Sequence, residues 1–410
     1  MPKLNLFRSP RLREIPTGIW ALGFVSLLMD VSSEMIHALL PVYLVTVMGA
    51  SMAVVGVIEG IAEATASIVK LLSGALSDWL GKRKLLAGLG YGLAALTKPI
   101  FPLASSLGWL VAARLIDRVG KGIRGAPRDA LIADIAPAHL RGASFGLRQS
   151  LDTIGAFVGP LIAMALMWLT ANQFRTIFWI AVIPAFLSVG VLVFFVREPE
   201  RPAALRKAGF PLGFGELRRL GLSYWLVVGV AGAFTLARFS EAFLILRAQG
   251  VGLSLVLIPM VLVLMNVVYA IAAYPAGVLS DRVNRLTMLI IGFALLVAAD
   301  LILAFTSGLF GVAVGIMLWG LHMGFTQGLL NTLVADTSPP ELRGTAYGMF
   351  NLLGGLATLA ASVLAGGLWD AGGPRATFSA GAGFTILALL GLALVRRRAP
   401  TLGAAHRSPA

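Results

Sequence analysis

Long apolar runs dominate this chain and constrain its fold more than any other feature. A helix that crosses a lipid bilayer needs about 20 mostly apolar residues. Twelve runs of this kind follow one another along the 410 residues, separated by glycine, proline and charged clusters. A soluble domain could not cover so much apolar surface, because 58% of the residues are hydrophobic and only 13% are charged. The sequence therefore predicts an all-α integral membrane protein with twelve transmembrane helices. The predicted spans are 17–48, 52–77, 85–104, 108–133, 144–169, 174–196, 223–247, 252–279, 286–306, 309–334, 345–369 and 376–396.

Most Lys and Arg residues lie in the tails and in alternate loops between the predicted spans, a distribution that indicates the orientation of the chain in the membrane. The formal net charge is +14, and most Lys and Arg residues fall in the N-terminal tail, in the loops at 82–84, 197–219 and 282–285, and after residue 395. With twelve spans, all of these segments lie on one side of the membrane. Cytoplasmic loops carry the excess of Lys and Arg. We therefore expect a multi-pass protein of the cytoplasmic (inner) membrane with both termini in the cytoplasm, and no nucleic-acid partner.

The two halves of the chain repeat each other. Residues 130–146 read ALIADIAPAHLRGASFG and residues 332–348 read TLVADTSPPELRGTAYG. The run Gly74–Asp78 (GALSD) recurs as Gly277–Asp281 (GVLSD), and Ser33-Glu34 recurs as Ser240-Glu241, at nearly the same separation. Halves with an even number of spans keep the same orientation, and parallel repeats of this kind occur in transporters. We predict two pseudo-symmetric six-helix bundles at 17–196 and 223–396, a cytoplasmic loop at 197–222, and cytoplasmic tails at 1–16 and 397–410.

Two loops and two helices carry a family resemblance. The segment Gly74–Lys84 (GALSDWLGKRK) resembles the hallmark loop of the major facilitator superfamily, and Gly277–Arg285 (GVLSDRVNR) is similar to its degenerate second copy. The run Ala113–Gly120 (ARLIDRVG) resembles the helix-4 motif of the proton-linked drug and small-molecule antiporters. Gly155–Ala163 (GAFVGPLIA) resembles the helix-5 motif associated with antiporters, on Gly155, Gly159 and Pro160.

The resemblance implies a conformational latch at the cytoplasmic side. In the family, the carboxylate at the position of Asp78 is thought to face the positive end of helix 11, which here would start near Gly344, and Asp281 would face helix 5 in the same way. Such contacts would hold the two halves together and break when the transporter opens inward. The expected latch residues are Gly74, Asp78, Gly81, Lys82, Arg83, Gly277, Asp281 and Arg285.

Ionisable residues inside the spans are the remaining functional signal, since charges at bilayer depth are costly and usually functional. They gather in the N-terminal half, while the C-terminal half offers mainly Arg238 and Glu241. By the resemblance, helices 1, 4, 7 and 10 line the central cavity. That mapping predicts that Asp30, Glu34, Arg114, Arg118, Arg238 and Glu241 face the cavity, with His37 as a polar lining residue.

Asp30, Glu34 and Arg114 resemble the proton-relay arrangement of drug/proton antiporters. A carboxylate that alternates between a cation and an unpaired buried environment can load and release a proton. Arg118 stands where the helix-4 motif usually has Gly, and with Arg238, Glu241 and His37 it is expected to bind substrate. Arg238 and Glu241 also fit a self-contained i,i+3 pair. The other charges on spans 2, 4 and 5 are interpreted as ion pairs within the N-terminal bundle: Glu59, Glu63, Lys70, Lys121, Arg124, Arg148 and Asp152.

Three functions remain open at this point. The leading prediction is a monomeric, proton-coupled exporter of a small molecule, driven by the proton gradient without a cofactor. The alternative is an organic-anion symporter or exchanger that uses Arg114, Arg118 and Arg238, and a divalent-metal transporter using Asp30, Glu34, His37 and methionines comes third. No enzyme is expected, because the chain has neither a His-Glu-x-x-His nor a Gly-x-Ser-x-Gly motif. No bound metal is expected either.

Overall fold

The protein was analysed as a computed structural model, which describes residues 14–137, 140–198, 220–280, 285–338 and 343–398. Within these ranges the chain is helical, without strands. Nine of its helical segments are long and apolar enough to cross a membrane. One of the nine, Met349–Ala393, has 45 residues, enough for two crossings, and Arg83–Leu103 and Leu107–Ile135 are two further helical segments with more charge or less length. The helices are those of a twelve-span membrane protein, as the apolar runs predicted.

The N-terminal bundle contains the helices from the start of the chain to Phe195. They are α2 (Thr17–His37), α3 (Leu40–Thr46), α4 (Met52–Leu80), α5 (Arg83–Thr97), α6 (Ile100–Leu103), α7 (Leu107–Ile135), α8 (Arg141–Leu169) and α9 (Phe174–Phe195). The first predicted span is divided into α2 and α3. Pro41 explains the division, because a proline ring clashes with the carbonyl four residues earlier, and α2 ends at that residue, His37.

The C-terminal bundle follows the same plan. It comprises α11 (Leu222–Ala237), α12 (Ala242–Gly250), η3 (Leu255–Leu257), α13 (Met260–Ser280), α14 (Arg285–Phe305), α15 (Leu309–Thr337) and α16 (Arg343–Arg398). The long α16 turns sharply at Gly373, which has a φ of 68° and is followed by Pro374, so it supplies the last two spans. Large apolar residues such as Phe194 and Phe310 are 81% and 84% exposed, as expected of surfaces that face lipid.

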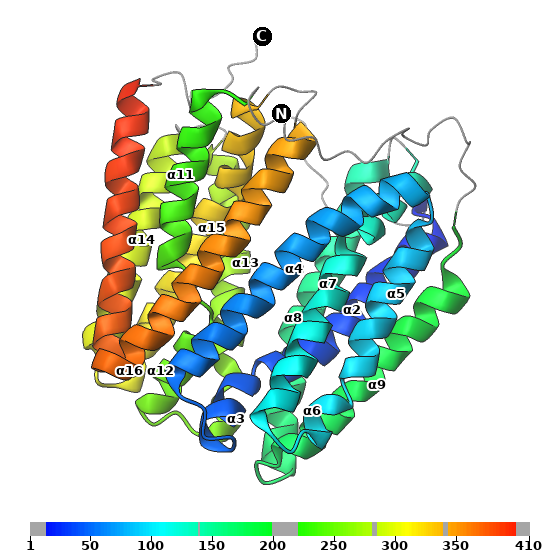
Figure 1. Ribbon diagram of the computed structural model, residues 1–410, viewed down its shortest axis with the longest axis horizontal. Helices are drawn as coiled ribbons and strands as arrows, with labels where there is room; N and C mark the ends of the chain where they lie inside the picture. Colours follow the sequence, from blue (N-terminus) through cyan, green and yellow to red (C-terminus); the bar gives the residue numbers. More distant parts are fainter. Residues whose placement is uncertain (1–13, 138–139, 199–219, 281–284, 339–342, 399–410) are drawn as a thin grey trace, which may run out of the picture.

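Figure 1 shows the two bundles side by side, with α4 and α16 running next to each other between them. The two helices approach closely through small residues: a Cβ on Gly56 would lie 2.1 Å from the Ser362 carbonyl oxygen, and one on Gly366 would lie 2.5 Å from that of Met52. Helices α8 and α13 form a second contact between the bundles, and α3 contacts α12. These contacts place any shared cavity on the axis between the bundles.

The two faces of the protein can be named by the ends of α4. At the Ser51 face, Ser51 caps α4 by accepting a hydrogen bond from the Val54 amide at 3.3 Å. At the Gly81 face, α4 ends on Gly81, whose φ of 67° suits a glycine C-cap. In Figure 1 the bundles stand closer together at the lower edge, the Ser51 face, than at the upper edge.

Candidate functional site

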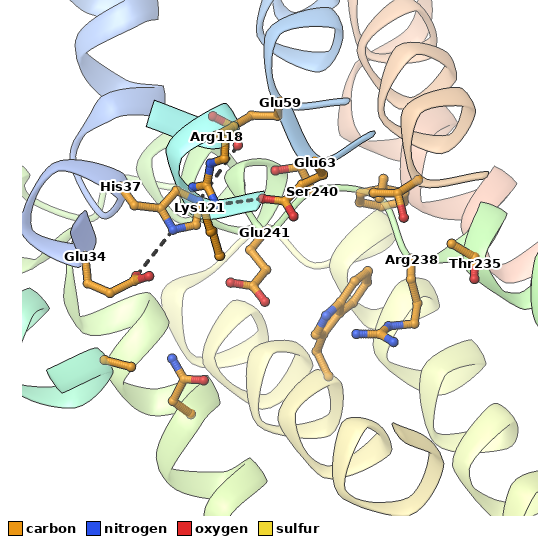
Figure 2. A pocket seen from close by; sticks show the side chains of 15 residues that line it. Glu34, His37, Glu59, Glu63, Arg118, Lys121, Thr235, Arg238, Ser240 and Glu241 are labelled. Atoms are coloured by element: carbon orange, nitrogen blue, oxygen red, sulfur yellow. Dashed lines mark hydrogen bonds and ion pairs between the residues drawn. The ribbon is translucent and has the colours of Figure 1, made fainter. Parts of the chain in front are cut away.

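A cavity of about 390 Å³ lies between the bundles, and both of them line it (Figure 2). Most of its lining is polar or charged, which is costly inside a membrane unless the groups are used or paired. The lining residues are Glu34, His37, Glu59, Glu63, Arg118, Lys121, Ala156, Thr235, Arg238, Phe239, Ser240, Glu241, Asn266, Trp319 and Thr358. Glu34 and Glu241, the two acids of the repeated Ser-Glu pair, therefore reach the same cavity from opposite bundles.

The predicted site residues divide into two groups by position. Glu34, His37, Arg118, Arg238 and Glu241 line the cavity as expected. Asp30 and Arg114 are not among the lining residues. Their roles in proton coupling stay predictions, and their surroundings are described below.

Ion pairs fill the N-terminal wall of the cavity. Arg114 and Glu59 lie 2.7 Å apart, and their side chains are only 3% and 1% exposed. Arg118 lies 3.1 Å from Glu63, whose side chain is 39% exposed (Figure 2). His37 connects the acids, with Nδ1 at 3.3 Å from Glu34 and Nε2 at 3.9 Å from Glu59. Arg114 and Arg118 are thus each matched by a carboxylate of α4, not by the acids of α2.

Asp30 belongs to a separate cluster between α2, α7 and α8. Its carboxyl group is in hydrogen-bond contact with that of Asp152 on α8. Arg148 donates to Asp152 at 2.8 Å, and Arg128 lies 3.8 Å from the same carboxylate. Two carboxyl groups in contact cannot both be ionised at low cost. Within the described residues, Arg148 and Arg128 lie against Asp152, and the Asp30 carboxyl group meets the same Asp152 side chain from α2.

The helix-5 motif packs directly on the two acids of α2. A Cβ on Gly155 would lie 3.0 Å from the Asp30 Cβ and 2.6 Å from the Leu27 carbonyl oxygen. A Cβ on Gly159 would lie 2.9 Å from both the Glu34 Cβ and the Val31 carbonyl oxygen. Pro160 lies inside α8, which continues through it. The glycines therefore allow α8 to approach α2 at the level of Asp30 and Glu34.

The C-terminal wall of the cavity is formed at a break between two helices. Arg238 is the C-cap of α11 and Glu241 is the N-cap of α12, so they do not form an i,i+3 pair on one continuous helix. The Ser240 amide donates to Ser362 Oγ at 3.2 Å, and the Ala242 amide donates to Ser240 Oγ at 3.2 Å. Backbone polar groups exposed by the break are partly satisfied in this way.

Arg238 and Lys121 differ from the other cavity cations. Neither forms an ion pair with a carboxylate within the part of the chain that the structure describes, and the Arg238 guanidinium lies 5.9 Å from the Phe234 ring centroid. Lys121 is exposed to the cavity. The cavity thus offers one cation from each bundle, Arg238 and Lys121, that no carboxylate of the described residues contacts directly.

Three buried ionisable residues were not singled out from the sequence. Lys98 contacts Asp117 at 2.9 Å and Ser33 at 3.0 Å. Asp300 in α14 and His322 in α15 are both 0% exposed. The expectation that Arg238 and Glu241 are the main buried charges of the C-terminal half was therefore incomplete. The signal for Asp300 was simple, since it is a lone acid within an otherwise apolar run.

The predicted latch is described only in part. Gly74 packs against α7, where a Cβ would lie 3.2 Å from that of Ala126, and Arg83 lies 3.1 Å from Asp134 of α7. Lys82 is the N-cap of α5. Asp281 lies outside the described residues, and the surroundings of Asp78, Gly277 and Arg285 are not described either. The latch between the halves at this face stays a prediction.

Metal binding finds no support in the described side chains. Within them, no group of three or more His, Asp or Glu residues is arranged to hold a metal ion. His37 does contact Glu34 and Glu59, but Arg114 also pairs with Glu59. These contacts fit a network of ion pairs between protein side chains better than a metal site.

Known proteins resemble this chain over most of its length. The family model described as Major Facilitator Superfamily matches residues 22–362 and 242–409. An uncharacterized MFS-type transporter of Methanocaldococcus jannaschii is 33% identical over 381 residues, which cover 92% of this chain and 94% of the relative.

Two solved structures share the fold. A bacterial homologue of the human lysosomal transporter Spinster, in an inward-facing and unoccupied conformation, aligns with a TM-score of 0.75 and 19% identity, over 98% of this chain and 100% of that one. The crystal structure of the human organic anion transporter MFSD10 (TETRAN) aligns with a TM-score of 0.65 and 20% identity, over 94% of this chain and 100% of that one.

Proposed function

Because the chain belongs to the major facilitator superfamily, whose members are secondary active transporters and not enzymes, we propose that it is a proton-coupled exporter of a small organic molecule. The proton gradient supplies the energy, and no cofactor takes part. The transporter works as a monomer in the cytoplasmic membrane by alternating access. The Gly81 face, where Lys82, Arg83 and Lys84 lie, is the cytoplasmic face in this proposal.

The observation that carries proton coupling is the contact between the carboxyl groups of Asp30 and Asp152. The pair holds one proton between α2 and α8, at the level where Gly155 brings the helices together. A movement of α8 that separates the acids and admits water would let Asp30 pass its proton to that water, which leaves Asp30 ionised. The same movement would alter the packing of Gly159 on Glu34, which lines the cavity. Proton release and substrate access are thereby connected through one helix.

The cavity supports an organic anion as the substrate class. Arg238 and Lys121 are the cavity cations without a direct carboxylate partner in the described chain, whereas Arg114 and Arg118 are paired. A guanidinium binds a carboxylate or sulfonate through charge-assisted hydrogen bonds. The human protein of the same fold is described as an organic anion transporter. An organic cation held by Glu34 and Glu241 is the other candidate.

A reconstituted assay tests both statements. Protein is placed in liposomes that contain a pH-sensitive dye, and a naphthalenesulfonate anion or the tetraphenylphosphonium cation is added outside. Exchange for protons raises the internal pH, whereas symport lowers it. We expect a rise with the anion, reduced at least tenfold by Asp30→Asn and by Arg238→Met.

Glu198→Gln is the matched control, because Glu198 follows the end of α9 and its carboxylate accepts a hydrogen bond from the Lys84 amide at 3.1 Å, away from the cavity. This variant should behave as the wild type. Full proton flux in Asp30→Asn would refute coupling through Asp30. A response to the cation alone would refute the organic-anion class.

A further inference from the structure

Asp300 is a buried acid to which the proposed function gives no role. It lies in α14 of the C-terminal bundle and is 0% exposed, as are Leu296 and Phe293 on the same face of the helix. Neither carboxyl oxygen has a hydrogen-bond partner in the described part of the chain, and no ion pair is formed there. In the N-terminal wall of the cavity, by contrast, Glu59 lies 2.7 Å from Arg114, Glu63 lies 3.1 Å from Arg118, and Glu34 lies 3.3 Å from the His37 imidazole. Asp300 therefore differs from these carboxylates, because no cation or hydrogen-bond donor of the described residues contacts it.

The carboxyl group lies one layer of side chains behind the cavity. A Cβ on Gly381 of α16 would lie 2.7 Å from Asp300 Oδ2 and 3.2 Å from the Phe239 ring, so these three groups meet. Phe239 lines the cavity and its ring centroid is 5.5 Å from that of Trp319, another lining residue. Phe239 belongs to the break between α11 and α12. A rearrangement of that break would remove the ring that separates Asp300 from the cavity.

Within the described residues, no hydrogen bond joins Asp300 to the polar side chains of α12, α15 or α16, and both ring nitrogens of His322 likewise lack a hydrogen-bond partner. From α15, His322 is fully buried between Trp319 and Phe234, with ring centroids 5.5 and 6.1 Å away. From α12, Arg247 donates to the carbonyl oxygens of Leu303, at 2.8 Å, and Thr306. From α16, the Thr385 hydroxyl donates to the Gly381 carbonyl at 3.0 Å. On the cavity side of the break stand Arg238 and Glu241 (Figure 2).

A carboxylate anion in this position would be shielded from water and would have no counter-ion within the described residues, which is strongly unfavourable inside a membrane. The neutral acid avoids this cost. We propose that Asp300 is a proton-binding site of the C-terminal bundle: it holds a proton in the present conformation and releases it when the 238–241 break opens toward the cavity. This site goes beyond the proposed function, since it lies in the other bundle from Asp30 and can be detected without it.

Infrared spectroscopy of the purified wild-type protein tests whether Asp300 carries a proton. The carbonyl band of a protonated carboxylic acid shifts when aspartate is labelled with ¹³C, and an acid without hydrogen-bond partners absorbs at higher frequency than the Asp30 acid in contact with Asp152. We expect a high-frequency band at neutral pH that Asp300→Asn removes and Asp30→Asn leaves. Absence of this band from the wild-type spectrum would overturn the proposal, whether or not the variant folds.

Proton movement tests the release step. In the liposome assay, Asp300→Asn cannot release a proton and should lower the substrate-induced pH change at least fivefold. Thr385→Val is the matched control, because it removes a buried polar group beside Gly381 without removing an acid. An unchanged pH response in Asp300→Asn would refute release. Loss of the response in Asp300→Asn with a normal response in Asp30→Asn would refute coupling through Asp30 and leave Asp300 as the proton site.

Discussion

Arg114 and Glu59 illustrate what one buried contact does inside the N-terminal bundle. They are 3% and 1% exposed and lie 2.7 Å apart. Removing one partner of a buried pair leaves the other charge uncompensated, at a cost of about 3–5 kcal/mol. We predict that Arg114→Met strongly lowers the thermal unfolding midpoint of the purified protein in detergent.

The double variant Glu59→Gln with Arg114→Met provides the control, since no isolated charge remains. It should recover most of the lost stability. If single and double variants were equally unstable, the charge pair would not be the cause. If Arg114→Met were stable yet abolished proton coupling, Arg114 would act as a relay and not as the counter-ion of Glu59.

The choice of partner for Arg114 was not predictable from sequence. Spacing places Asp30 and Glu34 on one face of a helix, and Glu59 and Glu63 on one face of another. It does not tell which of these faces Arg114 meets. That choice depends on the packing of α4 against α7, which only the three-dimensional arrangement provides.

At the scale of elements, α2 and α8 are brought together by two glycines. A side chain at Gly155 would collide with the Leu27 carbonyl oxygen at 2.6 Å, which is backbone and can move little. We predict that Gly155→Ala and Gly159→Ala each lower the free energy of unfolding by about 1–3 kcal/mol, as overpacking does. They should also reduce proton flux, because the helices separate at Asp30 and Glu34. Thermal unfolding and the liposome assay measure the two effects.

Gly190→Ala in α9 is the matched control, because a Cβ at this position would meet no neighbouring side chain or helix within 4 Å. It should leave stability unchanged or raise it by up to about 1 kcal/mol, since alanine favours helix more than glycine does. Equal losses at all three positions would point to a general effect of the added methyl group.

The two helix breaks differ in how far the sequence indicates them. Pro41 marks the division between α2 and α3. The segment between α11 and α12 contains neither Gly nor Pro from Ala237 to Ala242, so propensity alone favours a continuous helix there. Tertiary contacts such as that of Ser240 with Ser362 stabilise this break. The cavity positions of Arg238 and Glu241 depend on it.

For the whole molecule, the apolar runs and the internal repeat predicted the architecture well. Bilayer thickness sets the length of each apolar run, and the structural repeat leaves matching segments in the two halves of the sequence. The repeat also paired Glu34 with Glu241, and both line the cavity. The cavity itself depends on how two bundles meet. Sequence spacing therefore predicted candidate charges but not which of them stay unpaired, and it overlooked Asp300.

One cross-bundle contact has a direct bearing on alternating access. The Asp370 carboxylate of α16 accepts hydrogen bonds from the Met52 and Ala53 amides at 3.0 and 2.9 Å, at the N-terminus of α4. The predicted contact of Asp78 with the start of α16 would lie at the opposite end of the same two helices. An antiparallel pair would then have one acid at each end, each facing the partner helix's positive terminus.

We predict that Asp370→Asn weakens closure at the Ser51 face, because a carboxylate at a helix N-terminus contributes about 1 kcal/mol, which corresponds to a roughly fivefold change in the equilibrium between conformations. The chain has no cysteine, so spin labels can be attached uniquely at Val47→Cys and Leu257→Cys, which are 52% and 42% exposed and lie in opposite bundles. Pulsed electron paramagnetic resonance should show a larger population of long distances in Asp370→Asn than in the Glu198→Gln control. Identical distance distributions would mean that the α4–α16 glycine contacts close this face without the charge, since those contacts persist in both variants.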